Sequence, residues 1–521
     1  MPRTSNAVAL LNNLGSWSRH VSAAVPRAQD YFNQGLRLYY GFNHAESVRA
    51  FREAQRLDPG CVMCVWGEAA ALGPNMNAPM DTASERQAIA ATERALALLH
   101  SPKTSNRVKT RDGAWIQAIA ARYLGGASRA ERDSSYAAAM AAIADKNPND
   151  ADALAIAAEA AMDLSPWAYW AKDGTPKPGT QRLVAWLEQG MRVAESHPGA
   201  CHFYIHAVEA AHPERAVRCA ERLAALMPGA GHIVHMPAHI YIRVGRWADA
   251  IAMNKHAVHA DEKYFDGPHT PDAGFYAAAY QSHNFHFLTL AAVMAGSSTT
   301  AVSASQKVVG IVTPAIARVA PPLEALLAVP VQTLVTFGRW EEVLKTPLPP
   351  ADLRVALGHF WYARGMAFAA TGRLAEARAT IDSIQSVSAK MPAGEQRMTM
   401  DIAARMVEGE IAFSGKQFDR AVKALSEAVE IEDGLSYMEP PTWYHPVRHS
   451  LGRALLAADR AREAEQVYLA DLRRFPENGW SLRGLSLALA AQGNVEGAKA
   501  IEKRFRKAWR LSDVAITASR F

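Results

Sequence analysis

The chain consists of apolar, Ala-rich stretches of helical character, which Gly and Pro interrupt at short intervals. Alternating runs of β-branched residues, which are typical of strands, are scarce. Several stretches share one order: an apolar helix, a short polar or Gly-containing turn, and a second helix that begins near an alanine. The pattern therefore predicts an all-α protein built from helix pairs. The stretches are residues 31–59, 232–257, 283–302, 359–379, 449–464 and 484–498.

This order resembles the tetratricopeptide repeat (TPR), a pair of antiparallel helices with a period of about 34 residues. Gly35, Phe51, Ala54 and Pro59 carry the pattern in the first stretch. Small residues let paired helices approach closely, and a turn glycine supplies the positive φ that the turn needs. The turn Gly and the following Ala recur as Gly245 and Ala250, Gly296 and Ala301, and Gly372 and Ala377.

The TPR resemblance covers most of residues 28–510. It implies a right-handed α-solenoid of antiparallel helix pairs with a concave groove. Phrases over about residues 14–290 also resemble a broad group of bacterial TPR proteins, which implies the same fold and no particular activity. The predicted segments are an N-terminal extension (1–27), an N-terminal TPR-like array with long loops (28–199), His-rich central repeats (200–305) and a C-terminal TPR-like array (306–521).

Composition narrows the classes of function. The 521 residues carry a formal charge of +5, with 49% hydrophobic and 21% charged residues. This balance excludes a disordered chain, which would hold fewer apolar and more charged residues. The basic excess is small for neutralising phosphates, and no GxxxxGK[ST] or GxGxxG motif is present. We therefore expect no nucleic-acid partner.

The N-terminus and the cysteines indicate the compartment. The apolar run Ala7–Leu11 is shorter than the core of a signal peptide, and no run approaches the about 18 apolar residues of a membrane helix. We expect a cytoplasmic protein without membrane contact. Four cysteines do not make a disulfide framework. Cys61 and Cys64 form a CxxC that is either structural or a metal or redox pair, whereas Cys201 and Cys219 are isolated.

Histidine is distributed unevenly along the chain. Of 18 histidines, 11 lie in the 85 residues from His202 to His286, where uniform spreading would place about 3. When the turn Gly is counted as position 15 of its repeat, seven of them fall on first-helix positions that face the groove. We predict these seven as metal ligands: His202, His206, His232, His235, His239, His283 and His286.

Seven imidazoles in one groove need partners, because each unpaired buried polar group costs about 1–3 kcal/mol. A metal ion would supply them, and so would acidic side chains or water in a hydrated groove that binds an acidic peptide. Pro237 interrupts this region, and either it kinks the first helix or the helix begins there. In the second case His232 and His235 lie on the preceding turn. Both arrangements gather their rings with that of His239.

The remaining histidines receive other roles. His44 lies in a repeat turn, where capping or packing is its expected role. His359 and His449 are expected to face the groove singly and are not predicted as ligands. The histidines expected at the surface are His212, His256, His259 and His269.

The donor set suggests a class of metal. No HExxH motif is present, and imidazole suits copper, iron, zinc and nickel. Two three-His sites would favour copper, whereas three His with Glu209 or Asp163 would fit iron or zinc. Asp163 and Glu159 share a helix face and would orient a ligating imidazole through its other nitrogen. The predicted catalytic residues are Asp163, Glu209 and Arg243, and longer loops at 73–85, 164–180, 263–278 and 435–446 are further functional candidates.

These observations predict a metal-dependent enzyme in the groove of a TPR solenoid. The expected enzyme is an oxidoreductase that uses His-bound copper or iron on a small molecule or peptide. The expected cofactor is a transition metal ion, with copper favoured and iron or zinc as alternatives. The competing hypotheses are a TPR scaffold that binds a peptide or partner protein, and a zinc-dependent hydrolase. The sequence leaves homo-oligomerisation open.

Overall fold

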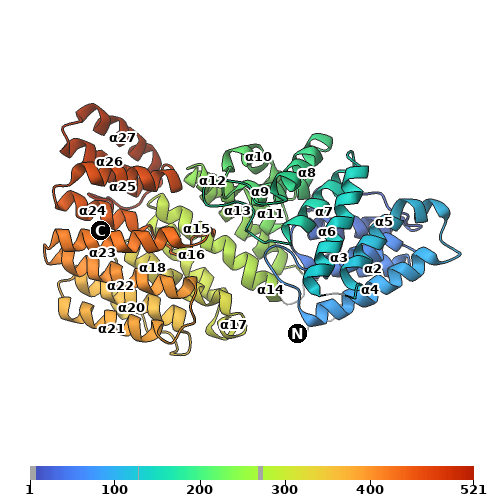
Figure 1. Cartoon of the computed structure of the whole chain (residues 1–521), viewed down its shortest axis with the longest axis horizontal. Coiled ribbons are helices and arrows are strands. Elements are labelled where there is room, and N and C mark those ends of the chain that lie inside the picture. Colours follow the sequence, from blue (N-terminus) through green and yellow to red (C-terminus); the bar gives the residue numbers. More distant parts are fainter. Residues whose placement is uncertain (1–7, 127, 268–273) are drawn as a thin grey trace. The chain divides into compact units, whose positions relative to one another are not determined.

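The structure is a computed structural model that describes residues 8–126, 128–267 and 274–521. Its regular elements are helices of varied length, joined mostly by short turns (Figure 1). No strand occurs in these three ranges, where the β pairings are two isolated bridges. The predicted all-α class is confirmed.

The chain folds as two compact units. Unit 1 comprises Met1–Ile240 and His259–Asp272, and unit 2 comprises Tyr241–Val258 and Ala273–Phe521. The boundary falls within two helices, α12 and α13, so each of these contributes residues to both units. The His-rich segment 200–305 is therefore divided between the units.

Unit 1 is built from helices that pack against their neighbours in sequence. Polar side chains fix several helix starts by accepting main-chain N–H groups of the first turn. Asn43, Asp81 and Ser105 do so, and Ser128 forms a capping box with Glu131. The helices are α1 (Pro26–Tyr40), α2 (His44–Leu57), α3 (Val62–Ala71), α4 (Thr82–His100), α5 (Asn106–Tyr123), α6 (Arg129–Lys146), α7 (Ala151–Met162), α8 (Thr180–Val193), α9 (Pro198–Val208), α10 (Val217–Leu226) and α11 (Gly231–His235).

Unit 2 likewise consists of helices that pack in sequence order around a large apolar core. Among the described residues of both units, no helix has the length and hydropathy needed to cross a bilayer. The helices are α12 (Pro237–Arg243) and α13 (Trp247–Phe265), which unit 2 shares, then α14 (Gly274–Tyr276), α15 (Ser282–Met294), α16 (Ser298–Ile311), α17 (Pro314–Val319), α18 (Val329–Thr336), α19 (Trp340–Lys345), α20 (Arg354–Ala370), α21 (Leu374–Ser388), α22 (Glu395–Ser414), α23 (Phe418–Gly434), α24 (Val447–Ala457), α25 (Ala461–Arg474), α26 (Gly479–Ala491) and α27 (Val495–Ala508).

The turns of the helix pairs contain the predicted glycines. Gly245, Gly296 and Gly372 adopt φ values of 77°, 74° and 79°, in the left-handed region that other residues rarely enter. The alanines that follow each turn are fully buried where the second helix meets the first. The TPR-like signature of glycine and alanine is thus confirmed, and the alanines are Ala250, Ala301 and Ala377.

Two glycines also allow the close packing of α1, α2 and α3. A Cβ atom on Gly35 of α1 would lie 2.8 Å from the Phe51 ring of α2, and one on Gly67 of α3 would overlap the same ring. Phe51 is 1% exposed, so its ring has no free space into which to move. Three helices therefore approach one aromatic side chain only because two of them carry glycine there.

The cysteines form two disulfides, both in unit 1. Cys61 bonds to Cys64 at the start of α3, so the CxxC is a disulfide in this structure. Cys201 bonds to Cys219, which joins α9 to α10. The prediction that Cys201 and Cys219 are isolated is therefore wrong. The packing of α9 against α10 brings together two positions that the sequence separates by 18 residues.

Substitution of Gly67 tests the packing around Phe51. The Gly67→Ala variant should lose about 1–3 kcal/mol of unfolding free energy, because the added methyl group displaces a buried ring. Gly113→Ala in α5 is the matched control, since a Cβ there meets no atom within 4 Å. That variant should gain about 0.5–1 kcal/mol from helix propensity. Denaturant unfolding followed by circular dichroism measures both, and equal stability of the two variants would contradict the packing argument.

Candidate metal centre

Three short segments of unit 1 bring histidines together. Helix α9 carries His202 and His206 one turn apart, so both rings lie on the same side of the helix. Helix α11 carries His232 and His235. Helix α12 begins at Pro237, so the chain follows the second of the two arrangements that the sequence allowed at this proline.

Five histidines and one glutamate form a buried group in unit 1, here called the histidine cluster. Each of its side chains is at most 2% exposed, so the cluster lies inside unit 1 and not along an open groove. Buried polar groups of this kind must be hydrogen-bonded or bound to an ion. The members are His202, His206, Glu209, His232, His235 and His239.

Two triads within the histidine cluster have the spacing of metal ligands. One nitrogen from each of His202, His206 and His232 lies within 4.8 Å of the other two. The same holds for ligand atoms of His206, Glu209 and His239. His206 belongs to both triads, so its hydrogen bonds decide which triad suits an ion better.

The Glu209 carboxylate lies between two imidazoles and is fully buried. Its Oε1 atom accepts from Nδ1 of His206 at 3.1 Å, and its Oε2 atom accepts from Nδ1 of His239 at 2.6 Å. A donating Nδ1 leaves the lone pair of each ring on Nε2. The Nε2 atom of His206 is buried and has no hydrogen-bond partner among the described residues. Glu209 thus orients imidazoles, and His206 offers a buried nitrogen to a ligand.

A main-chain carbonyl fixes the second imidazole of the first triad. Nδ1 of His202 donates to the carbonyl oxygen of Tyr40 at 2.6 Å. Because a carbonyl only accepts, the lone pair of His202 is on Nε2, which lies 3.2 Å from Nε2 of His232. The role of Tyr40 has no signal in the sequence, since a main-chain acceptor does not depend on residue type. One nitrogen of His206 completes this triad, and its bond to Glu209 leaves Nε2 as the available one. The first triad therefore suits an ion better than the second.

Electrostatics favour neutral rings at this site. Burial lowers the pKa of His202 and His206 well below the usual histidine value, and the neighbouring histidines lower it further. Metal ions bind the neutral form of imidazole. At neutral pH no proton therefore competes with an ion for these two nitrogens.

Aromatic side chains enclose the first triad. The Phe42 ring lies 4.6 Å from the His202 ring and 5.5 Å from the His232 ring, between centroids. The Trp167 ring meets the His206 ring edge-on at 5.1 Å. Phe42 and Trp167 both adopt positive φ, at 56° and 62°, which is costly for aromatic residues and recurs at functional sites. These two residues exclude water from the triad at the expense of backbone strain.

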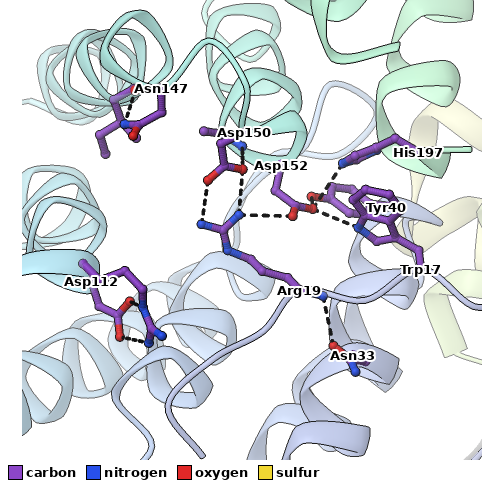
Figure 2. Close-up of polar contacts among 12 residues, drawn as sticks. Trp17, Arg19, Asn33, Tyr40, Asp112, Asn147, Asp150, Asp152 and His197 are labelled. Atoms are coloured by element: carbon purple, nitrogen blue, oxygen red, sulfur yellow. Dashed lines mark hydrogen bonds and ion pairs between the residues drawn. The ribbon is translucent and has the colours of Figure 1, made fainter. Parts of the chain in front are cut away.

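A buried aspartate connects the Tyr40 side chain to the start of α9 (Figure 2). Asp152 accepts from Tyr40 Oη at 2.6 Å, from Trp17 Nε1 at 3.0 Å and from Arg19 Nη1 at 3.1 Å. His197 Nε2 donates to the same carboxylate at 3.2 Å, and Nδ1 of that ring accepts from the first turn of α9. Burial alone would raise the pKa of Asp152, but His197, Arg19 and Tyr40 hold it well below its usual value. Asp152 thereby fixes both elements that position His202.

Asp163 and Glu159 do not take the orienting role predicted for them. Asp163 pairs with Arg122 Nη2 at 2.8 Å, and Glu159 accepts from the Tyr39 hydroxyl. Arg122 is 1% exposed, and its charge opposes the rise that burial gives the pKa of Asp163. The orienting position belongs to Glu209 instead. Burial and the adjacent Asp163 raise the pKa of Glu159 above its usual value.

Three predicted site residues lie in unit 2. Arg243, at the end of α12, faces Glu439 at 3.7 Å and donates to the carbonyl of Arg474 at 3.2 Å. His283 packs against Phe287 within α15. His286 stacks on Tyr444 at 5.5 Å between centroids, and burial lowers its pKa to about 3. The first triad consists of unit 1 residues and therefore includes none of Arg243, His283 and His286.

The histidines predicted at the surface mostly lie there. His256 and His259 on α13 are exposed, and His212 is partly exposed. His269 lies outside the described residues. His44 begins α2 and stacks on Tyr39, which matches its predicted packing role.

The chain resembles solved structures of TPR-like proteins, and no family model or curated protein matches it. Human IFIT1, in a dimer with m7Gppp-AAAA, is 13% identical, covers 95% of this chain and 92% of its own, and gives a TM-score of 0.35. Yeast Tom70 is 10% identical, covers 93% of each chain, and gives a TM-score of 0.30. These similarities concern the fold alone.

One sequence prediction is corrected by this comparison. Nucleic acid was excluded as a partner because the net charge is small, yet the matched structures include human IFIT1 dimers with m7Gppp-AAAA and with PPP-AAAA. Net charge is an average over the whole chain, whereas a ligand meets only the local field of its binding surface. A small net charge is therefore no ground for excluding a nucleic-acid partner, and that expectation is corrected.

The raised pKa of Glu159 makes stability depend on pH. Between the ordinary carboxyl pKa, about 4.3, and the raised value, the folded chain holds a proton that the unfolded chain releases. The unfolding free energy attributable to Glu159 should therefore fall as pH rises through this window. Glu159→Gln should remove that slope and stabilise the protein by about 1 kcal/mol or more at pH 8. Denaturant unfolding at several pH values tests this, and parallel profiles for Glu159→Gln and the exposed control Glu93→Gln would contradict it.

Proposed function

We propose that unit 1 holds one transition metal ion between His202, His206 and His232. The proposal is supported by the buried Nε2 atom of His206, which has no hydrogen-bond partner among the described residues, and by the grouping of one nitrogen from each of the three histidines within 4.8 Å. Nitrogen ligands of a tetrahedral ion lie about 3.4 Å apart. The 3.2 Å between the Nε2 atoms of His202 and His232 is close to that value.

Residues around the three histidines would orient the imidazole rings, as the outer-shell partners of a metal site do. Ligating imidazoles in proteins donate their other nitrogen to a carboxylate or a carbonyl. Glu209 accepts from His206 in this way, and the Tyr40 carbonyl accepts from His202. Both partners keep the proton on Nδ1, so each lone pair stays directed at the ion. Phe42 and Trp167 keep water away from the nitrogens.

Copper is the favoured ion, with iron or zinc as alternatives. All three donors are imidazole nitrogens, and among divalent first-row metals such sites bind copper most tightly. The ion would provide an open coordination position for redox chemistry with O₂ or, as zinc, for activating water. The function that follows is a TPR-like scaffold that carries a metal-dependent oxidoreductase centre in unit 1.

A metal-free binding scaffold is the second candidate function. Helical repeat proteins present extended surfaces to partners, and fold alone does not select an enzyme over a scaffold. The two candidates differ in one respect that can be measured. The scaffold needs no ion at the histidine cluster, and the metal centre requires one.

Metal content distinguishes these candidates. Protein purified without a histidine tag should contain about one equivalent of a transition metal by elemental analysis, if one ion occupies the first triad. His206→Ala should reduce that content well below one equivalent, because it removes the central ligand. The exposed His256→Ala on α13 is the matched control and should retain full occupancy. A metal-free wild type, or full occupancy in His206→Ala, would count against the metal centre.

Glu209 provides a test that leaves all three ligands in place. Glu209→Gln preserves the shape of the side chain, but its amide nitrogen cannot accept from a second imidazole. The affinity for the metal should fall by about 10- to 100-fold, the usual effect of losing an outer-shell partner. Competition with a chromophoric chelator measures that affinity, with the exposed Glu214→Gln as control. Unchanged affinity, or complete loss of the ion, would show that Glu209 does not act through the imidazoles.

A further inference from the structure

The positive charge of the chain is concentrated at the end of unit 2. The formal charge is +5 over 521 residues, and residues 495–510 alone hold six lysines and arginines against two glutamates, a net charge of +4. These residues form α27 and the turn that follows it (Figure 1). A ligand meets the local field of a surface, so the small average charge of the chain does not describe this segment.

Five basic residues of this segment form an exposed group, here called the basic row. Three lysines recur at every fourth residue of α27, so they lie on one side of the helix with a spacing of about 6 Å along its axis. An arginine three residues after Lys503 lies beside them, and another follows in the turn after the helix. All five residues are exposed to solvent. The members are Lys499, Lys503, Arg506, Lys507 and Arg510.

Acidic residues balance only part of the basic row. Glu496 pairs with Lys499 at 2.9 Å, and Glu502 pairs with Arg506 at 3.3 Å. Glu502 is shared, because Arg483 of α26 lies 3.3 Å from its other oxygen. The remaining three members form no ion pair within the part of the chain that the structure describes, and they are Lys503, Lys507 and Arg510.

The basic row lowers the stability of its own helix. Like charges four residues apart destabilise a helix, and Lys499, Lys503 and Lys507 make two such pairs. The helix dipole favours cations only in the last turn, so it does not compensate at Lys499 or Lys503. Arg373 and Glu376, at the start of α21, show the opposite arrangement, in which unlike charges three residues apart pair. A group that destabilises its own element is expected where residues are retained for binding.

The packing of α27 decides which kind of anionic partner fits the basic row. Ile501, Phe505 and Ala508 pack against the apolar core of unit 2, so the apolar side of the helix is already used. An amphipathic helix binds a membrane by inserting its apolar side, which α27 therefore does not offer. A row of exposed cations matches instead the regularly spaced phosphates of a nucleic-acid backbone, which lysine and arginine bind without reading the bases.

We propose that the basic row of α27 binds the phosphate backbone of a nucleic acid without preference for sequence. Each ammonium or guanidinium group would neutralise a phosphate and release its bound counterion, so binding should weaken as the salt concentration rises. RNA and DNA share this backbone chemistry. The surface lies in unit 2 and does not depend on the metal centre of unit 1.

Fluorescence anisotropy of the full chain tests the surface with two labelled probes, a single-stranded RNA of about 20 nucleotides and a DNA duplex of about 20 base pairs. At least one probe should bind saturably in 50 mM KCl. Between 50 and 200 mM KCl, a plot of log Kd against log[KCl] should rise with a slope of about 2–4, as three to five phosphate contacts require. Tighter binding of one probe identifies the kind of nucleic acid.

Three substitutions together remove the unpaired charges of the basic row. The variant that combines Lys503→Gln, Lys507→Gln and Arg510→Gln should lower the salt slope by about 2 and weaken binding by about 10-fold or more in 50 mM KCl. The matched control carries three glutamines at exposed cations elsewhere in unit 2, so its net charge is the same. It should bind like the wild type, and its changes are Arg378→Gln, Lys390→Gln and Lys423→Gln.

Thermal unfolding keeps the test independent of folding defects. The variant of the basic row should melt at or above the wild-type temperature, because it removes repulsion between like charges in α27. Sedimentation with vesicles of phosphatidylcholine and phosphatidylserine provides the alternative partner. The proposal is overturned if neither nucleic acid binds saturably in 50 mM KCl, whether or not the vesicles bind. It is also overturned if the two triple variants bind nucleic acid equally, since net charge alone would then explain the binding.

Discussion

The arrangement of the histidine cluster depends on one buried carboxylate. Glu209 lies between Nδ1 of His206 and Nδ1 of His239 and is fully buried. A carboxylate there is tolerable only while both hydrogen bonds are made, since each compensates part of its desolvation. Those bonds fix which nitrogen of each ring is protonated. Because Nδ1 of His206 is used in this way, its Nε2 atom has no partner in the part of the chain that the structure describes, and this atom makes the cluster a candidate metal centre.

Residues far from α9 in the sequence hold the candidate ligands in place. Tyr40 uses its carbonyl to hold His202 and its hydroxyl to reach Asp152. Asp152 also binds His197, which caps α9 through its other ring nitrogen. The residues that orient the candidate ligands are thus the residues that join α1, α7 and α9. Metal binding and folding of unit 1 should therefore be thermodynamically coupled.

Much of the fold and part of the site follow from local sequence. The turn glycines and the alanines after them were predictable, because a left-handed turn and a close helix contact each demand a particular residue. The spacing of His202 and His206 placed both on one face of a helix. Tyr40 and Asp152 could not be found in this way, because they act across more than 100 residues. Asp163 pairs with Arg122, which is 41 residues away in the sequence. Local spacing could not predict this ion pair.

X-ray absorption spectroscopy tests the central claim most directly. The measurement would use protein purified without a histidine tag, at the absorption edge of the metal that it contains. A metal ion held by His202, His206 and His232 should show a first shell of nitrogen at about 2.0–2.1 Å, with the outer-shell scattering of three imidazole rings. A shell composed only of oxygen or sulfur, or protein without any transition metal, would contradict this claim.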